Sequence, residues 1–487
     1  VTMTVPFTFA TSTNPIPLSN LDANFAAVGD STNITYTPPF TGGVAETLSA
    51  KLAQTVSVKD FGAVGDGVTD DTAAIQAAID AIHSAGGGEI FIPAGNWICG
   101  AITLRDKVSL VGSGNASKLI ASSGGGFDFL TGNALTNLKI SNFYLDCSNM
   151  PDSSGIYITG IQDSEISGVT VYNAAGFGWL IFGSVRCKYL RNTINVTRQW
   201  DGMTISTGST DNVIEGNIVY NSHDSGIGFT DTIGTVCVGN YVNRQKVGGV
   251  WYAPGIDAAG AKNATITGNY VIGNKFGISL LQHPNSGSQP KRVVVTGNTV
   301  ADGEYGVISG PVAVIPPAVS EATTRDGIVI SGNTIFSQDV QGIALVGADC
   351  LSVAVSGNQI SYCTTGIGLD TTVSPTLLSN LLFANGSGIN TFGNSNTSLN
   401  MAFNVFQDNT TDWVGGSGGG TTYILHNKGL DYPAGTLNHE AFASNWDFGG
   451  KLQLGGYYLW VDSVGRLRIK NGAPSSDTDG VVVGTQT

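Results

Sequence analysis

The chain has 487 residues, of which 12% are charged and 67 are glycine, and its formal net charge is −14. This composition favours a strand-rich protein with many turns over a helical one, because helical domains use more Lys and Glu. The negative charge, with no basic tract to offset it, argues against a nucleic-acid partner and an anionic membrane surface. No run of about 18 apolar residues occurs, so we expect no membrane insertion.

The opening VTMTVPFTFA lacks the basic and apolar regions of a secretory signal, so we expect no Sec targeting. Six cysteines lie far apart and mostly beside apolar residues, without CxxC pairs. This pattern is typical of buried thiols rather than of a disulfide framework. The cysteines are Cys99, Cys147, Cys187, Cys237, Cys350 and Cys363.

The first well-defined element follows the stretch SVKDFGAVGDGVTDD at residues 57–71. Apolar residues recur at helical spacing between Ile75 and Ile82, which predicts one amphipathic helix from Asp71 to His83. We expect Asp70, Asp71 and Thr72 to supply side-chain oxygens to the free amide groups at its start. Three glycines then end the helix, and a strand begins at Ile90 to Ile92.

A repeated unit follows this helix. It reads as a short β-branched strand, Gly-Asn, a second short strand, a polar turn and Gly-Ile-x-Leu, as in ATITGNYVIGNKFGISL from Ala264 and VAVSGNQISYCTTGIGL from Val353. Successive Asn residues lie 23 to 35 positions apart, which is too short for most propeller blades, and no helix is present for a leucine-rich horseshoe. They are Asn217, Asn240, Asn269, Asn298, Asn333 and Asn358.

A coiled parallel β-solenoid fits this repeat best. Coils stacked about 4.8 Å apart would align each Asn in a ladder of mutual hydrogen bonds. The Gly beside each Asn allows the corner between strands to take a positive φ. The open edge of the first coil needs a cover, so we expect the helix Asp71 to His83 to cap the solenoid.

The segment DFGAVGDGVTDDTAAIQAAIDA, followed by GGGEIFIPAGNW and then the repeats, resembles the pectate-lyase-like right-handed parallel β-helix superfamily. That superfamily includes polygalacturonases and bacteriophage tailspike depolymerases, and the resemblance covers about Val56 to Phe406. The head, from STNPIPLSNLDANFAAV onward, resembles the neck by which tailspikes join the virion, and YYLWVDSVGRLRIKNGAPSSDTDGVVVGTQ resembles a common tailspike ending.

This resemblance implies an all-β fold: a right-handed parallel β-helix, that is a single-stranded solenoid, with an N-terminal capping helix and a C-terminal β trimerisation domain. The implied domains are a neck or virion-attachment segment at 1–55, a catalytic β-helix at 56–410 and the trimerisation domain at 421–487. It also implies a homotrimer of the virion tail, assembled in the host cytoplasm. Such a trimer contacts other tail proteins through its N-terminus and degrades bacterial surface polysaccharide outside the host cell.

The C-terminal segment carries a signal of its own. Apolar residues alternate in GGKLQLGGYYLWVDSVGRLRIKNG, which predicts strands and turns after Thr422. A hairpin this short cannot bury both faces alone, so it packs against identical copies as a clamp or folds back as a lid on the last coil.

Two acids stand out when the Gly-Ile-x-Leu ends are aligned. Asp201 of RQWDGMTI and Asp224 of NSHDSGIGF fall near the same position of successive coils, about one strand spacing apart. Glycoside hydrolysis requires such a carboxylate pair, although each Asp also suits a simple turn role. The two stretches resemble the Asn-Thr-Asp-Gly and Asp-Asp-Cys motifs of polygalacturonases, but Ser225 replaces the second Asp of the latter. Their Gly-His-Gly motif is absent near KVGGVW.

Further candidates surround this pair. His223 could act as a base or orient Asp224, or be a solvated turn histidine, and aromatic rings in these coils could bind sugar faces or stack in the core. Basic residues near these coils suit an acidic polysaccharide or surface pairing, and further acids are available. The candidate substrate-binding residues are Trp200, Trp251, Tyr252, Arg198, Glu215 and Asp257. Glu215, Asp257 and Glu304 are also reserve acids, any of which could take part in the reaction.

These residues, together with the tailspike resemblance, predict an endo-acting hydrolase with Asp201 and Asp224 as the acid/base pair and no metal or organic cofactor. The resemblance implies that its substrate is a bacterial capsule or lipopolysaccharide O-antigen. A carboxyl separation of about 5 to 5.5 Å implies retention of configuration, and one of about 6.5 to 9.5 Å implies inversion. One alternative is a polysaccharide lyase, in which His223, a Tyr or an Arg removes the proton α to a uronate carboxylate that Arg198, Arg244 or Lys246 neutralises. The other is a non-catalytic glycan-binding adhesin.

Overall fold

The chain is an all-β right-handed parallel β-helix, as the sequence predicted. It contains two compact units, Val1–Thr323 and Thr324–Thr487. Among the described residues, no helix is both long and apolar enough to cross a membrane. The computed structural model describes residues 2–3, 34–52, 54–123, 126–244, 253–310, 326–346, 352–370, 375–392, 398–414, 421–425, 452–454, 457–461, 467–471, 475–476 and 481–482.

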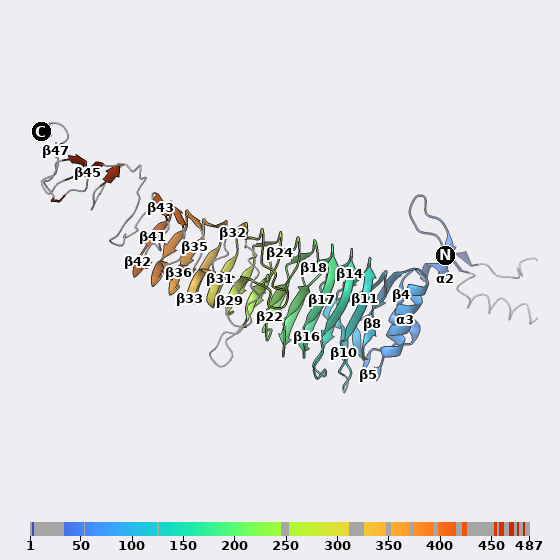
Figure 1. Ribbon diagram of the computed structural model, residues 1–487. Helices are drawn as coiled ribbons and strands as arrows, with labels where there is room; N and C mark the ends of the chain where they lie inside the picture. The colour runs from blue at the N-terminus through green and yellow to red at the C-terminus, as the bar shows by residue number, and fades with distance from the viewer. Residues whose placement is uncertain are drawn as a thin grey trace, which may run out of the picture. The chain divides into compact units, whose positions relative to one another are not determined.

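Each coil of the first unit contributes three short strands. In one coil, β18 (Lys188–Leu190), β19 (Thr193–Thr197) and β20 (Met203–Ser206) follow one another along the chain. Each pairs in parallel with its counterpart in the next coil, so that β18 pairs with β21, β19 with β22 and β20 with β23. The stacked coils therefore form three rows of parallel strands, which can be followed side by side in Figure 1.

The remaining strands of the first unit extend these rows in both directions. The first row contains β4 (Val56–Ser57), β6 (Gly88–Ile92), β9 (Val108–Gly112), β12 (Lys139–Ser141), β15 (Glu165–Ser167), β21 (Val213–Glu215), β24 (Val236–Val238), β27 (Thr265–Thr267) and β30 (Val294–Thr296). The second contains β5 (Asp66–Asp70), β7 (Gly95–Cys99), β10 (Ser117–Ala121), β13 (Tyr144–Asp146), β16 (Thr170–Ala174), β22 (Ile218–Tyr220), β25 (Tyr241–Asn243) and β28 (Tyr270–Ile272). The third contains β8 (Ile102–Thr103), β11 (Leu130–Thr136), β14 (Ile156–Gln162), β17 (Trp179–Val185), β23 (Ile227–Phe229), β26 (Pro254–Asp257) and β29 (Phe276–Leu281), and β31 (Thr299–Gly310) joins the second and third rows.

The second unit repeats the same plan. Its first-row strands are β32 (Ile328–Ser331), β34 (Val353–Ser356), β37 (Thr376–Leu378), β40 (Ser398–Ala402) and β43 (Thr421–Leu425). The other rows contain β33 (Thr334–Val346), β35 (Gln359–Ser361), β36 (Thr365–Asp370), β38 (Leu381–Phe383), β39 (Ser387–Phe392), β41 (Val405–Gln407) and β42 (Thr411–Val414).

The C-terminal strands form a separate antiparallel sheet, as the alternating pattern predicted. It contains β44 (Leu452–Leu454), β45 (Tyr457–Val461), β46 (Leu467–Asn471) and β47 (Val481–Val482). The sequence placed the end of the repeats at 410 and the start of the C-terminal segment at 421, but the parallel strands continue beyond these points. Strand β42 pairs with β39, and β43 pairs with β40 over its whole length, so the solenoid pairing reaches Leu425.

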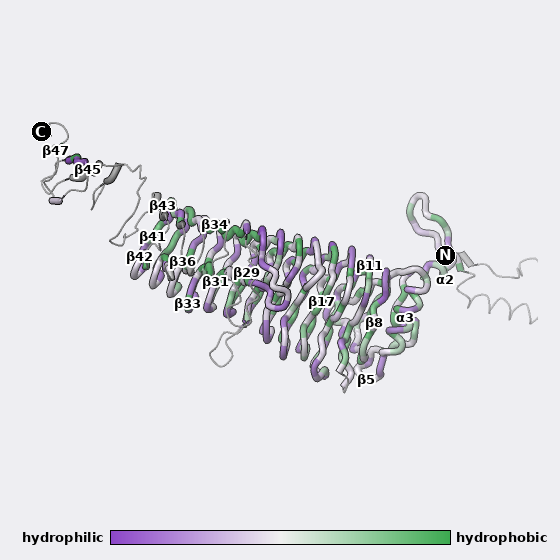
Figure 2. The backbone as a smooth tube through the Cα atoms, in the orientation of Figure 1, coloured by the Kyte–Doolittle hydropathy of each residue, from purple (hydrophilic) through white to green (hydrophobic). Residues whose placement is uncertain are grey.

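Alternate strand residues fill the interior of the solenoid. In the first row, Ile214, Cys237 and Ile266 are fully buried and stack on one another in register. Figure 2 shows the corresponding alternation of hydrophobic and hydrophilic residues along the coils. Burial of apolar surface at each coil is the main stabilising contribution, at about 25 cal/mol per Å². Five of the six cysteines are buried free thiols, as predicted, and Cys350 lies outside the described residues.

The predicted asparagine ladder is present. In the first unit the side-chain amide of each Asn donates to the side-chain oxygen of the next, at 2.9 Å, from Asn192 through Asn217, Asn240 and Asn269 to Asn298. In the second unit Asn333 donates to Asn358, and Asn358 donates to Asn380, at 2.9 Å in each case. The glycines before these residues have a positive φ, between 62° and 64° in Gly239, Gly268 and Gly297, which a residue with a Cβ rarely adopts.

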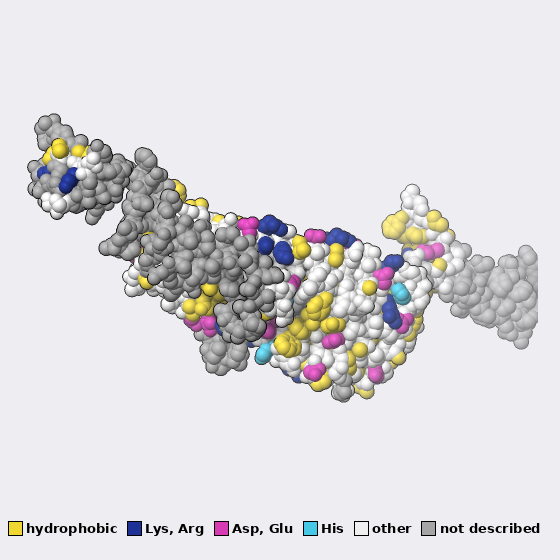
Figure 3. Space-filling model, viewed as in Figure 1, with side chains coloured by type: hydrophobic (Ala, Val, Ile, Leu, Met, Phe, Trp, Pro, Cys, Tyr) yellow, Lys and Arg dark blue, Asp and Glu magenta, His cyan; other side chains and the backbone are white. Residues whose placement is uncertain are grey.

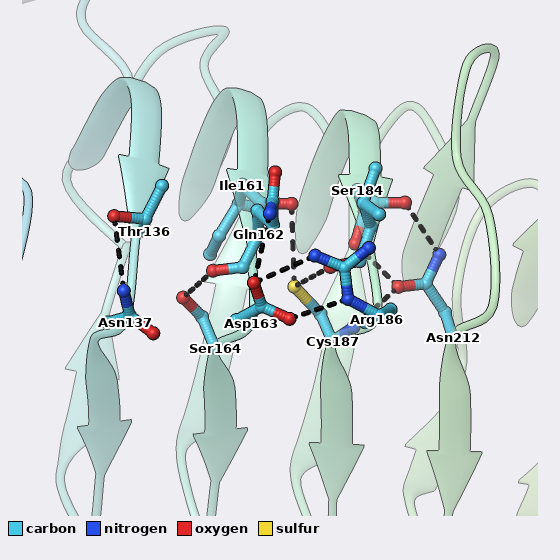
Figure 4. A network of polar contacts seen from close by, with 11 residues as sticks. Thr136, Asn137, Ile161, Gln162, Asp163, Ser164, Ser184, Arg186, Cys187 and Asn212 are labelled. Atoms are coloured by element: carbon cyan, nitrogen blue, oxygen red, sulfur yellow. Dashed lines mark hydrogen bonds and ion pairs between the residues drawn. The ribbon is translucent and has the colours of Figure 1, made fainter.

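A second corner, between the third and first rows, carries polar side chains on its outer surface. Asn137, Asp163 and Arg186 occupy it in successive coils, each with φ of 51° or 52°. The Arg186 guanidinium binds the Asp163 carboxylate with two hydrogen bonds, of 2.7 and 2.8 Å (Figure 4). This charge is therefore paired across coils on the protein surface.

The helix of the opening segment is α3 (Thr72–Ser84), within one residue of the prediction. It packs against β6, β8 and β9 through a stripe that includes Ile75 and Ile79. Asp70 accepts a hydrogen bond from the Thr72 amide, as expected. The capping role predicted for Asp71 is wrong, because its carboxylate instead accepts hydrogen bonds from the amides of Val64 and Gly65, at 2.7 and 3.0 Å.

Three smaller elements and a short sheet complete the N-terminal part. The 3-10 helices are η2 (Val58–Phe61) and η3 (Gly114–Ala116). Within the residues expected to form the neck, the described part contains β1 (Thr2–Met3), β2 (Ile34–Tyr36), β3 (Glu46–Thr47) and α2 (Leu48–Leu52).

We predict that Asn269→Ala lowers the free energy of unfolding by about 1–3 kcal/mol, because it leaves buried polar groups of neighbouring coils without partners. The Asn269 amide donates to the Cys237 carbonyl and to Asn298, and its oxygen accepts from both nitrogens of Asn240. Urea unfolding followed by circular dichroism measures the change. The half-exposed Asn195, in β19, provides the control Asn195→Ala, and an equal loss in both variants would contradict a special role of the ladder.

Candidate active site

The two predicted acids lie in turns that join the second and third rows. Asp201 lies in the turn between β19 and β20, and Asp224 in the turn between β22 and β23, one coil later. The Gly202 amide donates to the Ser225 carbonyl, so Asp201 stacks beside Ser225 and is one residue out of step with Asp224. Parallel pairing therefore brings the two acids to adjacent coils, as the alignment of the repeats predicted.

Asp201 is held in place by two hydrogen bonds. The Thr204 hydroxyl donates to one carboxyl oxygen at 2.5 Å, and the Ser225 amide donates to the other at 2.8 Å. Burial raises the pKa of Asp201 to about 7, and the charges of Asp224 and Asp257 add to the rise, while both hydrogen bonds oppose it. A carboxyl group with such a pKa is partly protonated at neutral pH and can act as a general acid.

Asp257 joins these two acids from a third coil. It is the last residue of β26 and points away from the interior, because its neighbour Ile256 is fully buried. Burial raises the pKa of Asp257 to about 6, the charge of Asp224 adds to this, and the Ser279 hydroxyl partly offsets it. The three carboxylates therefore interact electrostatically and form one cluster, the acid cluster, made of Asp201, Asp224 and Asp257.

The sequence contained a signal for Asp257 at the second residue after the glycine of each repeat, whereas the acid pair lies just before that glycine. Thr204, Gly228 and Asp257 occupy this position in successive coils and are register partners in β20, β23 and β26. When DGMT, SGIG and PGID are aligned, their last residues are Thr204, Gly228 and Asp257. Asp257 therefore lies one strand spacing from Gly228. Because the alignment used the residue before the glycine, the sequence placed Asp257 among the substrate-binding and reserve acids and not in the acid/base pair.

The predicted aromatic residues are distributed between the core and the surface. Trp200 is 50% exposed and stacks on Phe177, with ring centroids 5.8 Å apart and planes 11° apart. Trp179, at an alternating position of β17, is fully buried. Trp200 therefore presents a ring beside Asp201, where a sugar face can stack. Trp251 and Tyr252 lie outside the described residues.

The remaining candidates differ in their relation to the acid cluster. His223 is exposed in the same turn as Asp224, and its backbone amide donates to the Thr197 hydroxyl. Arg198 is exposed, and its guanidinium donates to the Met150 carbonyl. Glu215 is the last residue of β21, in the first row, and belongs to a different sheet from β20, β23 and β26. The structure does not bring Glu215 to the acid cluster.

Charged side chains are a minority on the face of the protein that is visible in Figure 3. Uncharged side chains and backbone form most of that face. Within the described ranges, no group of three or more His, Cys, Asp or Glu residues has an arrangement that could hold a metal ion.

Three family models match parts of the chain. The model of rhamnogalacturonase A/epimerase, pectate lyase-like, matches residues 55–250, that of capsule depolymerase residues 406–485, and that of the periplasmic copper-binding protein NosD residues 252–432. The first match contains Asp201 and Asp224.

Individual relatives point to polysaccharide-acting proteins. Mannuronan C5-epimerase AlgE1 of Azotobacter vinelandii is 30% identical over 211 residues, which cover 38% of this chain and 15% of that protein. The tail spike protein of Shigella phage Sf6 is 43% identical over 103 residues, which cover 20% of this chain and 16% of that protein. For the curated relatives it matches, the chain spans from 10% to 34% of their length.

Among solved structures, the tailspike protein of E. coli bacteriophage HK620, in complex with a pentasaccharide, has a TM-score of 0.56 and 17% identity. The match covers 82% of this chain and 75% of that chain, and at this identity it is a likeness of fold. Together with the family models and the solenoid, these matches identify the class. The solenoid, the family-model matches and the tail spike relative support a tailspike depolymerase of the pectate-lyase-like parallel β-helix superfamily.

The raised pKa of Asp201 predicts a specific pH dependence of stability. Because its folded-state pKa of about 7 exceeds the unfolded value of 3.8, Asp201 destabilises the fold progressively as pH rises from about 4 to 7. We expect Asp201→Asn to unfold at a higher temperature than the unmodified protein at pH 8, with a smaller difference at pH 4. Thermal unfolding across this pH range measures the effect.

Asp163→Asn is the matched control for this measurement. The hydrogen bonds from Arg186 lower the pKa of Asp163, so its stabilising contribution is present at neutral pH and is lost as pH falls through the folded-state pKa. The two variants should therefore show opposite trends with pH. An Asp201→Asn difference that does not change between pH 4 and pH 8 would contradict the raised pKa.

Proposed function

We propose that this protein is a tailspike depolymerase that cleaves a bacterial surface polysaccharide, a capsule or a lipopolysaccharide O-antigen, within the chain and by hydrolysis. The observation that carries this proposal is the pKa of Asp201, raised to about 7 beside the negative charge of Asp224. Glycoside hydrolysis needs one carboxyl group that is protonated near neutral pH and a second that is ionised.

In this proposal Asp201 donates its proton to the glycosidic oxygen as the bond to the anomeric carbon breaks. Asp224 acts as the base that takes a proton from the attacking water, or as the nucleophile that binds the anomeric carbon. The Thr204 hydroxyl and the Ser225 amide orient the Asp201 carboxyl group through their hydrogen bonds. Trp200 stacks against a neighbouring sugar of the polymer, and His223 lies close enough in sequence to assist Asp224.

The second candidate function is a polysaccharide lyase or epimerase, which the relatives named mannuronan C5-epimerase and alginate lyase favour. Both reactions begin with removal of the proton α to a uronate carboxylate. They would use His223 or a nearby Tyr or Arg as the base, and Arg198, Arg244 or Lys246 to neutralise the uronate. Of these, Lys246 lies outside the described residues. Lyase products contain an unsaturated uronate that absorbs ultraviolet light, whereas hydrolysis products do not.

We predict that Asp201→Asn and Asp224→Asn each lower the rate of polysaccharide cleavage by about 10²–10⁴-fold, because each removes a group that transfers a proton or bonds to the substrate. The measurement is the release of reducing ends from polysaccharides of a panel of bacterial hosts, with ultraviolet absorbance recorded in parallel. Glu215→Gln, on the other sheet, is the control and should retain full activity. Wild-type cleavage by both Asp variants would refute the assignment, and binding without any shortening of the polymer would identify an adhesin.

The assembly proposed for the chain follows the tailspike relationship. In this proposal, residues 1–55 form the neck that joins the virion tail, and the catalytic solenoid begins at residue 56 and includes β43. The residues after Leu425 contribute to a parallel homotrimer. The helix α3 caps the first coil, which its packing on β6, β8 and β9 supports. The antiparallel pairing of β44 to β47 supports a separate C-terminal element, since so small a sheet needs a partner surface to bury a face.

We predict that removal of residues 427–487 converts the trimer to monomers that keep a β-rich circular dichroism spectrum. The truncation begins after Leu425, because β43 pairs with β40 and belongs to the solenoid. Light scattering gives the mass of the product. A heat-resistant trimer without these residues would rule out the clamp and leave the lid as the remaining interpretation.

A further inference from the structure

The second unit contains an open pocket of about 570 Å³, within the range of about 300–1,000 Å³ that is typical of small-molecule sites. Its lining comes from three successive coils: from β33, from the turn between β35 and β36, and from the turn between β38 and β39. This is the turn of the repeat that carries Asp201 and Asp224 in the first unit. None of the residues of the acid cluster lines the pocket, so it is a separate candidate site.

An exposed aromatic ring forms part of the pocket lining. Tyr362 is 62% exposed, and its ring packs against that of Phe383 with centroids 5.7 Å apart and planes 87° apart. This single ring contact supports Tyr362 from the next coil and leaves most of its surface accessible. A flat, accessible ring in a pocket is a platform on which the apolar face of a sugar can stack.

The turn itself does not need an aromatic residue at this place. Ser337, Tyr362 and Ala384 each follow a register partner in β33, β35 and β38, and their φ values are 55°, 56° and 53°. The same left-handed conformation is thus adopted by a serine and an alanine in the neighbouring coils. The Tyr362 ring is therefore not required to form the turn, and its accessible surface is available for a ligand.

Hydrogen-bonding groups line the same pocket. The Thr364 hydroxyl donates to the Asp339 backbone carbonyl at 2.7 Å, so its oxygen can accept a hydrogen bond from a ligand. Asp339 is exposed, and its carboxylate is a strong acceptor for ligand hydroxyl groups. The combination of an aromatic ring with acceptor oxygens suits a ligand that has both an apolar face and several hydroxyl groups, and a sugar ring has this character.

We propose that this pocket binds a sugar ring of the polysaccharide and forms a second, non-catalytic glycan site. Tyr362 stacks on the apolar face of the ring, while Asp339 and Thr364 accept hydrogen bonds from its hydroxyl groups. A second attachment point raises the effective concentration of the polymer at the protein, so a chain that leaves one site is retained by the other. The inference rests on the proposed function only for the identity of the polymer, because the pocket can bind a sugar whether or not the acid cluster cleaves it.

Saturation-transfer NMR of the full-length protein tests the pocket with simple probes, the methyl glycosides of glucose, galactose, mannose, rhamnose and N-acetylglucosamine. The protein carries Trp200→Ala, so that the ring beside Asp201 cannot stack on the probe. We expect at least one glycoside to bind, with the strongest transfer to the C–H protons on one face of the sugar ring, as stacking requires. No saturation transfer to any of these glycosides would overturn the proposal.

Variants locate the binding in the structure. Tyr362→Ala should weaken glycoside binding roughly 3- to 10-fold, the contribution of an aromatic stacking contact, whereas Tyr362→Phe should retain it. Alanine fits this turn, since Ala384 has the same conformation one coil later. Phe403→Ala is the matched control and should leave binding unchanged. Phe403 is 54% exposed with φ of 57° in the same unit, but it does not line the pocket. Binding that Tyr362→Ala does not weaken would overturn the proposal.

Polymer binding separates this inference from the proposed function. A host polysaccharide that the unmodified protein cleaves is mixed with Asp201→Asn protein, with and without Tyr362→Ala, and the bound fraction is measured by co-sedimentation. We expect Asp201→Asn protein to hold the polymer and the double variant to hold less. Equal binding by both would refute the pocket and leave depolymerisation intact. Glycoside binding that depends on Tyr362, without cleavage of any polysaccharide, would refute the function and leave the pocket intact.

Light scattering of the same variants tests the other occupant of such a pocket, a second copy of this chain. We expect Tyr362→Ala to have the mass of the unmodified protein. A lower mass together with unchanged glycoside binding would assign Tyr362 to a contact between copies and overturn the proposal.

Discussion

The register between coils is the constraint on which the rest of the structure depends. The turn between the first and second rows has only two residues in successive coils, such as Gly239 and Asn240, or Gly268 and Asn269. Each Asn bonds to the coil before it and to the coil after it, so a coil cannot slip without breaking buried hydrogen bonds on both sides. In the coils of the ladder from Asn192 to Asn298, the variation in length therefore falls in the other two turns.

The candidate site is built from one of these variable turns. Asp201 and Asp224 lie in the turn that leads into the third row, and Asp257 lies on the third-row strand itself. The fixed frame places them on three successive coils, which are about 4.8 Å apart, although their spacing along the sequence is irregular. Precise placement of side chains on a rigid element is what catalysis requires of a scaffold.

Such a cluster opposes folding at neutral pH. Burial raises the pKa values of Asp201 and Asp257 to about 7 and about 6, and each of these carboxyl groups is less stable in its ionised form inside the protein than in water. The asparagine ladder and the apolar interior supply the stability that offsets the cost of burying these carboxyl groups. One fold can carry different activities, so the reaction depends on which side chains occupy the outer positions of the solenoid.

The sequence alone was sufficient to predict the solenoid, its asparagine ladder and the helix α3, because each depends on local patterns that repeat along the chain. It also predicted that Asp201 and Asp224 would lie on adjacent coils, since both occupy one place in the repeat. Only the tertiary structure brought Asp257 to them, separated Glu215 onto another sheet and assigned Asp71 to the amides of Val64 and Gly65. These outcomes depend on where turns of unequal length place the side chains of neighbouring coils. Packing and burial set those positions, and the repeat pattern alone does not.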